Sequence, residues 1–321
     1  MREVAFEYRV CVRLERRPGV VARQLGASVG EAARRVVDVV RVEPGPAFER
    51  RADLTPAAIP PAVLDGDARV GEWRRVTAAF DGPPARAREV AERGVEVGVL
   101  ERRLRDGRDE VRRVARYPDW IGGLVGVENK PDLGRPGDLD LQLRKDTSLG
   151  LFDRVVLATA SHVTGAHLDR FPDPVGVWRL RPGEGIEVIR GAEPLDRDGG
   201  GLQVVERHPG QTEIRPVDAD QIARQRRRVA ERAYGRGWRP DGFPACAECE
   251  VASVAGTPTP DCAWKDRLVD PDAECGPECP GHDPADPRYD ADDLARERSR
   301  RTGWEKDPPG RRRRQAGLDD F

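Results

Sequence analysis

The chain has 321 residues, of which 35% are charged and 38% hydrophobic, and its formal net charge at pH 7 is −2. This length suits one large domain with insertions, or two domains. No run of about 18 apolar residues occurs, which argues against a transmembrane helix. The first ten residues, MREVAFEYRV, lack the apolar core of a secretion signal. We therefore expect a cytoplasmic protein without a membrane partner.

Residues 1–47 are expected to form the first part of an α/β core. Apolar residues recur at helical spacing along residues 3–16, and a Pro-Gly pair follows this predicted helix. Glu7 lies near its apolar side, and Cys11 follows one turn later. The valine-rich stretch Arg35–Val42 predicts the first core strand.

Residues 48–109 are expected to form a helical insertion. Helical patterns cover residues 56–63, 71–80 and 84–94, and a turn follows at Gly107. Three helices and a hairpin indicate a winged-helix-like unit that binds DNA, although a lid or a structural cap would have the same pattern. The next core strand is expected at residues 110–117, where the second part of the core, residues 110–239, begins.

The central stretch of the chain runs from Pro118-Asp119 to Lys130. Ile121–Val127, with its glycines, predicts a hairpin turn that enters a short buried strand, and strand alternation then places Glu128 and Lys130 on one face. Four of the 55 cationic residues are lysine and the other 51 are arginine, so a lysine beside Glu128 indicates a role that arginine cannot fill. An Asp, a Glu and a Lys at one end of a hairpin can hold a divalent metal and orient a water, as phosphodiester hydrolysis requires.

These residues resemble a known motif. Pro118-Asp119 followed by Glu128-Asn129-Lys130 resembles the PD-(D/E)xK motif of the restriction-endonuclease-like nuclease superfamily. Gln142, on a helix that Asp138 is expected to cap, is similar to the glutamine motif of the RecB-like branch, although Asp146 stands where that motif usually carries a tyrosine. The run ENKPDLGRPGD also resembles a haloarchaeal family of uncharacterised proteins.

The resemblance implies an α/β fold with a restriction-endonuclease-like mixed sheet flanked by helices, and Mg²⁺ or Mn²⁺ as the cofactor. Asp119 and Glu128 would bind the metal together with Glu7, because a glutamate from the first helix often joins the site in these nucleases. Lys130 would stabilise the charge that develops at phosphorus or help to deprotonate the attacking water. Gln142 would orient the water or the substrate.

The downstream part of the core alternates strands and helices. Strands are expected at residues 154–159 and 175–180, with parallel pairing, and an edge strand at 185–190. A helix at 218–235 has a basic side, and the residues of this side that we expect to bind nucleic acid are Arg224, Arg227 and Arg228. Such a side can neutralise phosphates, but it is also typical of a solvated helix.

Residues 240–283 are expected to form a metal module, because they contain the five cysteines Cys246, Cys249, Cys262, Cys275 and Cys279. Thiols packed so densely in a reducing compartment indicate a metal site, and two cysteine pairs separated by a loop are typical of zinc ribbons. The alternative is a [4Fe–4S] cluster. The resemblance to RecB-like nucleases would then supply Cys11 as the N-terminal ligand.

Residues 284–321 are rich in Pro, Asp and Arg, which predicts a disordered tail with a basic cluster. The function expected from the whole chain is a magnesium-dependent nuclease acting on DNA in repair, recombination or defence. The alternative is a catalytically inactive nuclease-fold protein that acts as a nucleic-acid-binding or regulatory module.

Overall fold

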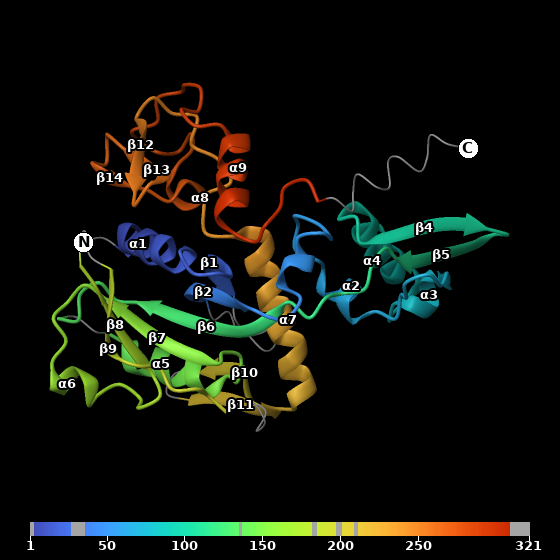
Figure 1. Cartoon of the computed structure of the whole chain (residues 1–321), viewed down its shortest axis with the longest axis horizontal. Helices are drawn as coiled ribbons and strands as arrows, with labels where there is room; N and C mark the ends of the chain where they lie inside the picture. Colours follow the sequence, from blue (N-terminus) through green and yellow to red (C-terminus); the bar gives the residue numbers. More distant parts are fainter. Residues whose placement is uncertain are drawn as a thin grey trace.

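The computed structural model describes residues 3–26, 36–134, 137–181, 185–196, 201–208 and 211–308 (Figure 1). A six-stranded mixed sheet with the order β1-β2-β6-β7-β8-β9 forms its centre. The strands of this sheet are β1 Val20–Gly26, β2 Val36–Pro44, β6 Ile121–Asn129, β7 Arg154–Thr159, β8 Gly176–Leu180 and β9 Ile186–Arg190. The predicted α/β class, with a mixed sheet flanked by helices, is confirmed.

Strand direction changes across the sheet. β1 pairs antiparallel with β2, and β2 pairs antiparallel with β6. β6, β7 and β8 are parallel to one another, and β9 is an antiparallel edge strand. The parallel pairing and the edge strand were predicted from the alternation of strands and helices. β1 was not predicted, because its seven residues include Arg23 and Gln24 in a short, weak pattern.

Helices cover both faces of the sheet. α1 (Glu3–Glu15) packs on one face, where its apolar residues form a cluster with Val125 and Val127 of β6. α5 (Leu139–Ser148) and α7 (Ala219–Arg236) pack on the other face, in a cluster that includes Leu124. α7 begins where it was predicted, because Asp218 forms a capping box with Gln221. α6 (Gly165–Leu168) lies between β7 and β8.

The insertion between β2 and β6 is a separate small unit with its own sheet. Its elements are the 3₁₀-helix η1 Phe48–Arg51, α2 Pro61–Asp65, β3 Arg74–Arg75, α3 Val76–Ala79, α4 Pro84–Glu96, β4 Leu100–Arg105 and β5 Arg108–Arg113. Its three strands have the order β3-β5-β4, and Val63, Ala87 and Val111 lie in its hydrophobic core. The strand expected at 110–117 is therefore β5 of this insertion and not a core strand, because it pairs with β4. The boundary expected at residue 109 lies too early.

The cysteine-rich segment folds beyond α7. It contains a small sheet, β12 Cys249–Val254, β13 Thr257–Cys262 and β14 Arg267–Leu268, followed by the helices α8 Pro271–Glu274 and α9 Ala291–Arg301. In Figure 1 this module lies above α1, on the side away from the central sheet. Tyr8 of α1 donates a hydrogen bond to the Val269 carbonyl oxygen at 3.3 Å. A further hairpin, β10 Gly201–His208 and β11 Gln211–Val217, precedes α7.

The prediction of a disordered tail from residue 284 is wrong for residues 284–308. α9 buries Leu294, and Arg298 donates hydrogen bonds to the Tyr234 and Gly235 carbonyl oxygens at the end of α7. The Trp304 indole donates to the Pro56 carbonyl oxygen at 2.8 Å. The basic cluster predicted after residue 308 lies outside the described residues. No helix within the described ranges combines the length and apolar character needed to cross a membrane.

Candidate functional site

Asp119 and Glu128 lie near opposite ends of one strand. β6 is continuous from Ile121 to Asn129, so seven steps of about 3.3 Å place the backbone of Glu128 about 23 Å along the strand from Ile121, and Asp119 precedes Ile121. Asp119 is exposed and lines a hollow of about 490 Å³ beside α7. The prediction that Asp119 and Glu128 bind one metal ion is therefore wrong.

The two glycines after Ile121 are the cause of this error, because they belong to the strand and not to a turn. A Cβ at Gly122 would collide with the Pro44 carbonyl oxygen of β2, and one at Gly123 would lie 2.9 Å from Oε2 of Glu43. Glycine at these positions lets the end of β2 approach β6 closely. The glycines are thus explained by a neighbouring strand and not by a change in chain direction.

Asp38 of β2 is the carboxylate that lies beside Glu128. The pairing of Val39 with Val127 places Asp38 opposite Glu128, and Oδ2 of Asp38 accepts a hydrogen bond from the Asn129 backbone N–H at 2.7 Å. This N–H lies between Glu128 and Lys130 in the chain. Asp38 and Glu128 also have further partners. Our sequence reasoning missed Asp38, although an acidic residue inside a run of valines was a usable signal.

Glu128 lies on the face of the sheet that α5 covers, and Lys130 directly follows the last residue of β6. Leu124 packs on the α5 side and Val125 on the α1 side, so alternation along β6 directs Glu128 toward α5. Glu128 is buried, and Lys130 is half-buried with its backbone N–H bonded to the Ala158 carbonyl oxygen at 2.9 Å. Gln142 is half-buried in the first turns of α5, which begins after the loop that follows Lys130.

Glu7 lies one strand away from this group. Its carboxylate accepts hydrogen bonds from Arg23 Nε at 2.5 Å and from Gln24 Nε2 at 2.7 Å, both from β1. Arg23 pairs with Val39 and Leu25 with Val37, which brings the backbone of Gln24 next to that of Asp38. Burial raises the pKa of Glu7, and the Arg23 guanidinium opposes this rise. Glu7 is thus engaged by a buried arginine and by Gln24 of the edge strand β1.

We expect the raised pKa of Glu7 to appear in the pH dependence of stability. A carboxyl whose pKa is higher in the folded than in the unfolded state stabilises the fold below the unfolded value, and this contribution is lost as pH rises through the folded value. The free energy of unfolding should therefore decline above about pH 4.5, the ordinary pKa of glutamate, more steeply in the wild type than in Glu7→Gln. Urea unfolding across pH 4.5–8 measures this difference. Glu3→Gln, at an exposed position of the same helix, should keep the wild-type slope, and parallel profiles for Glu7→Gln and wild type would contradict the expectation.

Asp38 and Glu128 suit a magnesium ion. Within the described ranges no three or more His, Cys, Asp or Glu side chains stand close enough together to hold a metal. Mg²⁺, however, usually keeps several waters and is bound by one or two carboxylates together with substrate phosphates. Two carboxylates with a neighbouring lysine therefore match the needs of this ion better than those of a metal that requires a complete set of protein ligands.

The basic side of α7 is occupied by contacts within the protein. Arg228 pairs with Asp65 of α2 at 2.6 Å, and Arg227 lies 3.8 Å from the same carboxylate. Arg224 is half-buried. Arg227 and Arg228 thus join α7 to the insertion, since Asp65 meets them there. Phosphate binding by Arg224, Arg227 and Arg228 stays a prediction.

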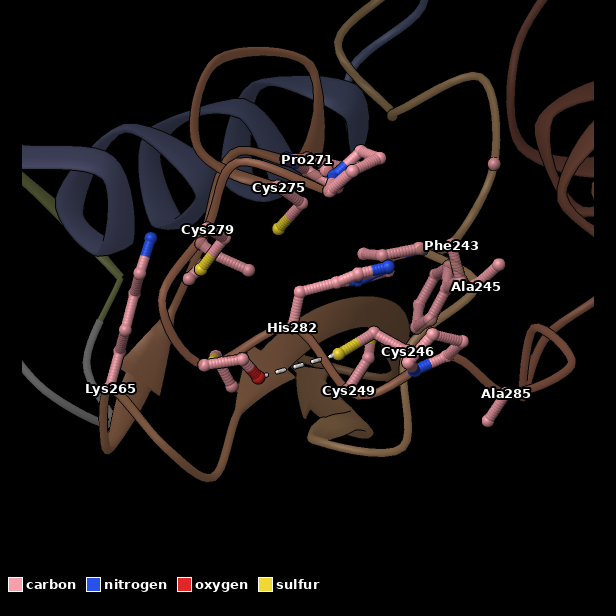
Figure 2. A pocket seen from close by; sticks show the side chains of 18 of the residues that line it. Phe243, Ala245, Cys246, Cys249, Lys265, Pro271, Cys275, Cys279, His282 and Ala285 are labelled. Carbon is pink, nitrogen blue, oxygen red and sulfur yellow. Dashed lines mark hydrogen bonds between the residues drawn. The ribbon is translucent and has the colours of Figure 1, made fainter.

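The cysteines of the C-terminal module line one cavity of about 840 Å³ (Figure 2). The thiols and imidazole that border it are Cys246, Cys249, Cys262, Cys275, Cys279 and His282. All of these cysteines are free thiols. Nδ1 of His282 is buried and lacks a hydrogen-bond partner within the described part of the chain. A cavity bordered by soft donors and one unsatisfied imidazole nitrogen has the chemistry of a transition-metal site.

The thiols of this cavity lie close enough together to raise one another's pKa. The pKa of Cys249 is raised to about 11 by burial and by the neighbouring thiols Cys275, Cys246 and Cys262. Burial also raises the pKa of Cys275, which Lys265 partly offsets. Close thiols that resist ionisation in the absence of a cation are the thiols that a divalent metal would deprotonate.

Cys11 is not part of this cavity. It is fully buried between α1 and the central sheet, and the groups that affect its pKa, beside burial, are Glu7, Arg23, Glu15 and Arg239. The structure thus does not bring the N-terminal cysteine expected for an iron–sulfur cluster to the five C-terminal cysteines.

Comparison with known proteins supplies a family but no activity. No curated protein and no solved structure matches the chain. One family model matches residues 20–284, which include the central sheet from β1 onward, the insertion and all five cysteines of the C-terminal module. The chain belongs to DUF5787, a family of unknown function.

Proposed function

We propose that the protein is a magnesium-dependent nuclease whose site contains Asp38, Glu128 and Lys130. The observation that carries this proposal is the hydrogen bond from the Asn129 N–H to Asp38, because it holds one carboxylate beside the Glu-x-Lys segment of the neighbouring strand. The motif resemblance in the sequence supplies Glu128 and Lys130. Asp38 takes the role for which Asp119 was expected.

The order of elements supports the same proposal. A helix (α1), three antiparallel strands (β1, β2 and β6), a crossover helix (α5) and a parallel strand (β7) follow one another around this group. The same order of elements accompanies the motif resemblance in the sequence: a first helix, core strands, and a helix that leads to an apolar strand. The insertion interrupts this order at the end of β2 remote from Asp38.

Each residue of the group has a distinct task in hydrolysis. Asp38 and Glu128 would hold the ion, which lowers the pKa of a bound water and offsets the charge of the scissile phosphate. Lys130 would stabilise the negative charge that develops on the phosphoryl oxygens, and its half-buried position strengthens that interaction relative to bulk water. Gln142 would hydrogen-bond to the water or to the substrate from α5.

Cleavage of plasmid and linear duplex DNA in the presence of Mg²⁺ tests the proposal. We expect Glu128→Gln and Lys130→Ala each to lower the cleavage rate by about 100-fold or more, since loss of such charge stabilisation costs several kcal/mol and 1.4 kcal/mol corresponds to tenfold. Lys306→Ala, which removes an exposed lysine that pairs with Asp292, is the matched control and should retain the wild-type rate. Equal cleavage by all four proteins would show that this site is not catalytic.

A second candidate is a nucleic-acid-binding protein with an inactive core. The insertion favours it, because three helices and three strands in the order α2, β3, α3, α4, β4, β5 match a winged-helix-like arrangement. Duplex binding measured without divalent ions separates the two candidates. Tight binding, together with no cleavage in Mg²⁺ or Mn²⁺, would favour this second function over hydrolysis.

A further inference from the structure

The C-terminal module has little apolar material to hold it together. Its hydrophobic cluster, within the described residues, contains the buried Phe243, Cys249 and Leu294. β12 and β13 form a hairpin of two six-residue strands, and β14 adds two residues. An isolated hairpin of this size is marginally stable in water. Val254 and Leu268 pack against the α1 cluster, and a bound metal would supply further stability.

We infer that a zinc ion supplies this stability and that Cys246, Cys249, Cys262 and Cys275 bind it. These four thiols come from three segments that border the cavity of Figure 2. Within the described residues they do not stand close enough together to hold a metal as they are, so they would have to close on the ion as it binds. Zinc prefers four ligands in a tetrahedral arrangement, and its structural sites are commonly built from cysteine alone. The proposal concerns folding and does not depend on the nuclease activity.

The first pair of ligands is preorganised by the backbone. Cys246 and Cys249 enclose a tight turn, in which the Cys249 N–H donates to the Cys246 carbonyl oxygen at 3.1 Å. The Asp283 N–H donates to Sγ of Cys246 at 3.5 Å. A backbone N–H directed at sulfur favours the thiolate form that a metal requires.

The other two ligands approach Cys249 from different elements. Cys262 lies directly opposite Cys249 in the β12–β13 pair, and Cys275 follows α8. Both thiols border the same cavity as Cys246 and Cys249. Lys265 and Arg267 lie near Cys275 and would offset the negative charge of four thiolates around a dication.

Zinc bound at Cys275 would also attach the module to the central domain. Cys275 ends α8, and Glu274 of that helix accepts a hydrogen bond from the Asp270 N–H at 3.2 Å. The Asp270 carboxylate in turn pairs with Arg23 of β1 at 2.5 Å. The metal would therefore fix the loop through which the module contacts β1, as well as the module itself.

Metal analysis of the purified full-length chain tests this inference. We expect about one zinc per chain, retained on gel filtration and released when a mercurial titrates the thiols. Cys249→Ser and Cys275→Ser should lose the metal. Cys279→Ser, which alters a thiol of the same cavity, and Cys11→Ser, which alters a thiol in the central core, should retain it.

A measurement on the wild type keeps the test valid if the serine variants fail to fold. Exchange of zinc for Co²⁺ should produce the intense visible bands of tetrahedral cobalt with a thiolate charge-transfer band, and a strong chelator should lower the melting temperature. Iron with acid-labile sulfide, or no metal and no cobalt spectrum, would overturn the zinc assignment. Loss of zinc from Cys279→Ser would overturn the proposed set of ligands.

Discussion

Replacing Arg51 with methionine should lower the free energy of unfolding by about 3–5 kcal/mol, because it leaves a buried carboxylate without its counter-charge. The side chain of Arg51 is 0% exposed and that of its partner, Glu231 of α7, is 1% exposed. Arg51 donates to both carboxylate oxygens of Glu231, at 2.8 and 2.6 Å. Its remaining hydrogen bonds go to the Thr55 and Ala57 carbonyl oxygens, and its guanidinium stacks on Tyr234 with 3.8 Å to the ring centroid.

An exposed arginine of the same insertion provides the control. Arg69 pairs with Asp67 and Glu72, but its side chain is 56% exposed, so Arg69→Met should change the stability by no more than about 1 kcal/mol. Urea unfolding at neutral pH measures both variants. The double variant Arg51→Met, Glu231→Leu should recover part of the loss, since removing both partners also removes the unpaired charge. Equal effects of Arg51→Met and Arg69→Met would contradict this account of how the insertion is held to α7.

Asp38→Asn should abolish most of the DNA cleavage, whereas Asp119→Asn should leave it unchanged. Asp38 lies beside Glu128 through its bond to the Asn129 N–H, but Asp119 is near the other end of β6. Loss of one of two carboxylates that bind the metal removes several kcal/mol of transition-state stabilisation, so we expect a decrease of about 100-fold or more for Asp38→Asn. Initial cleavage rates at saturating Mg²⁺ measure both effects.

The two substitutions are matched in chemistry, which makes the comparison informative. Each exchanges a carboxylate for an amide of the same shape, and each can be checked for folding by its unfolding transition in urea. A raised requirement for Mg²⁺ in Asp38→Asn would support its role as a ligand. If Asp119→Asn loses activity and Asp38→Asn does not, the residues at the start of β6 form the site, and the group around Asp38 has a structural role.

Sequence patterns predicted the helices and strands that form because of their own residues and not because of a distant partner. The helix at 3–15 followed from its apolar spacing, and the helix at 219–236 from the Asp218 cap. The strand at 154–159 was predicted with its observed boundaries, since it is a short run of apolar residues beside a charged one. For the candidate site, the sequence predicted that a buried strand leads into Glu128, and β6 contains this residue; a shared face for Glu128 and Lys130 stays a prediction.

Features that depend on a distant partner could not be predicted in this way. Gly122 and Gly123 were interpreted as a turn, but they are explained by the close approach of the Pro44 carbonyl oxygen and the Glu43 side chain, almost eighty residues earlier in the chain. The sequence indicated a strand near residues 108–113, but only its pairing with β4 shows that this strand belongs to the insertion. Asp38 was missed for the same reason, because only the register of β2 against β6 brings it to Glu128.

The composition of residues 284–308 was also misleading. Their abundance of Pro, Asp and Arg is typical of disorder, yet α9 is held by contacts that its own sequence does not reveal. Arg298 binds the final carbonyl oxygens of α7, and its guanidinium stacks on Trp304 with 4.3 Å to the ring centroid. A charged side chain thus provides an anchor where an apolar one would be expected.

The chain leaves the central sheet and returns to it at neighbouring points. The Gly45 N–H donates to the Trp120 carbonyl oxygen and the Ala47 N–H to that of Asp119, both at 2.8 Å. The insertion therefore lies in the connection between β2 and β6, and hydrogen bonds join the two segments at the point where it begins and ends. The entropic cost of closing a loop grows only slowly with its length, so this connection tolerates insertions of very different length. The host sheet can keep its connectivity whether this position holds a folded unit or a short turn.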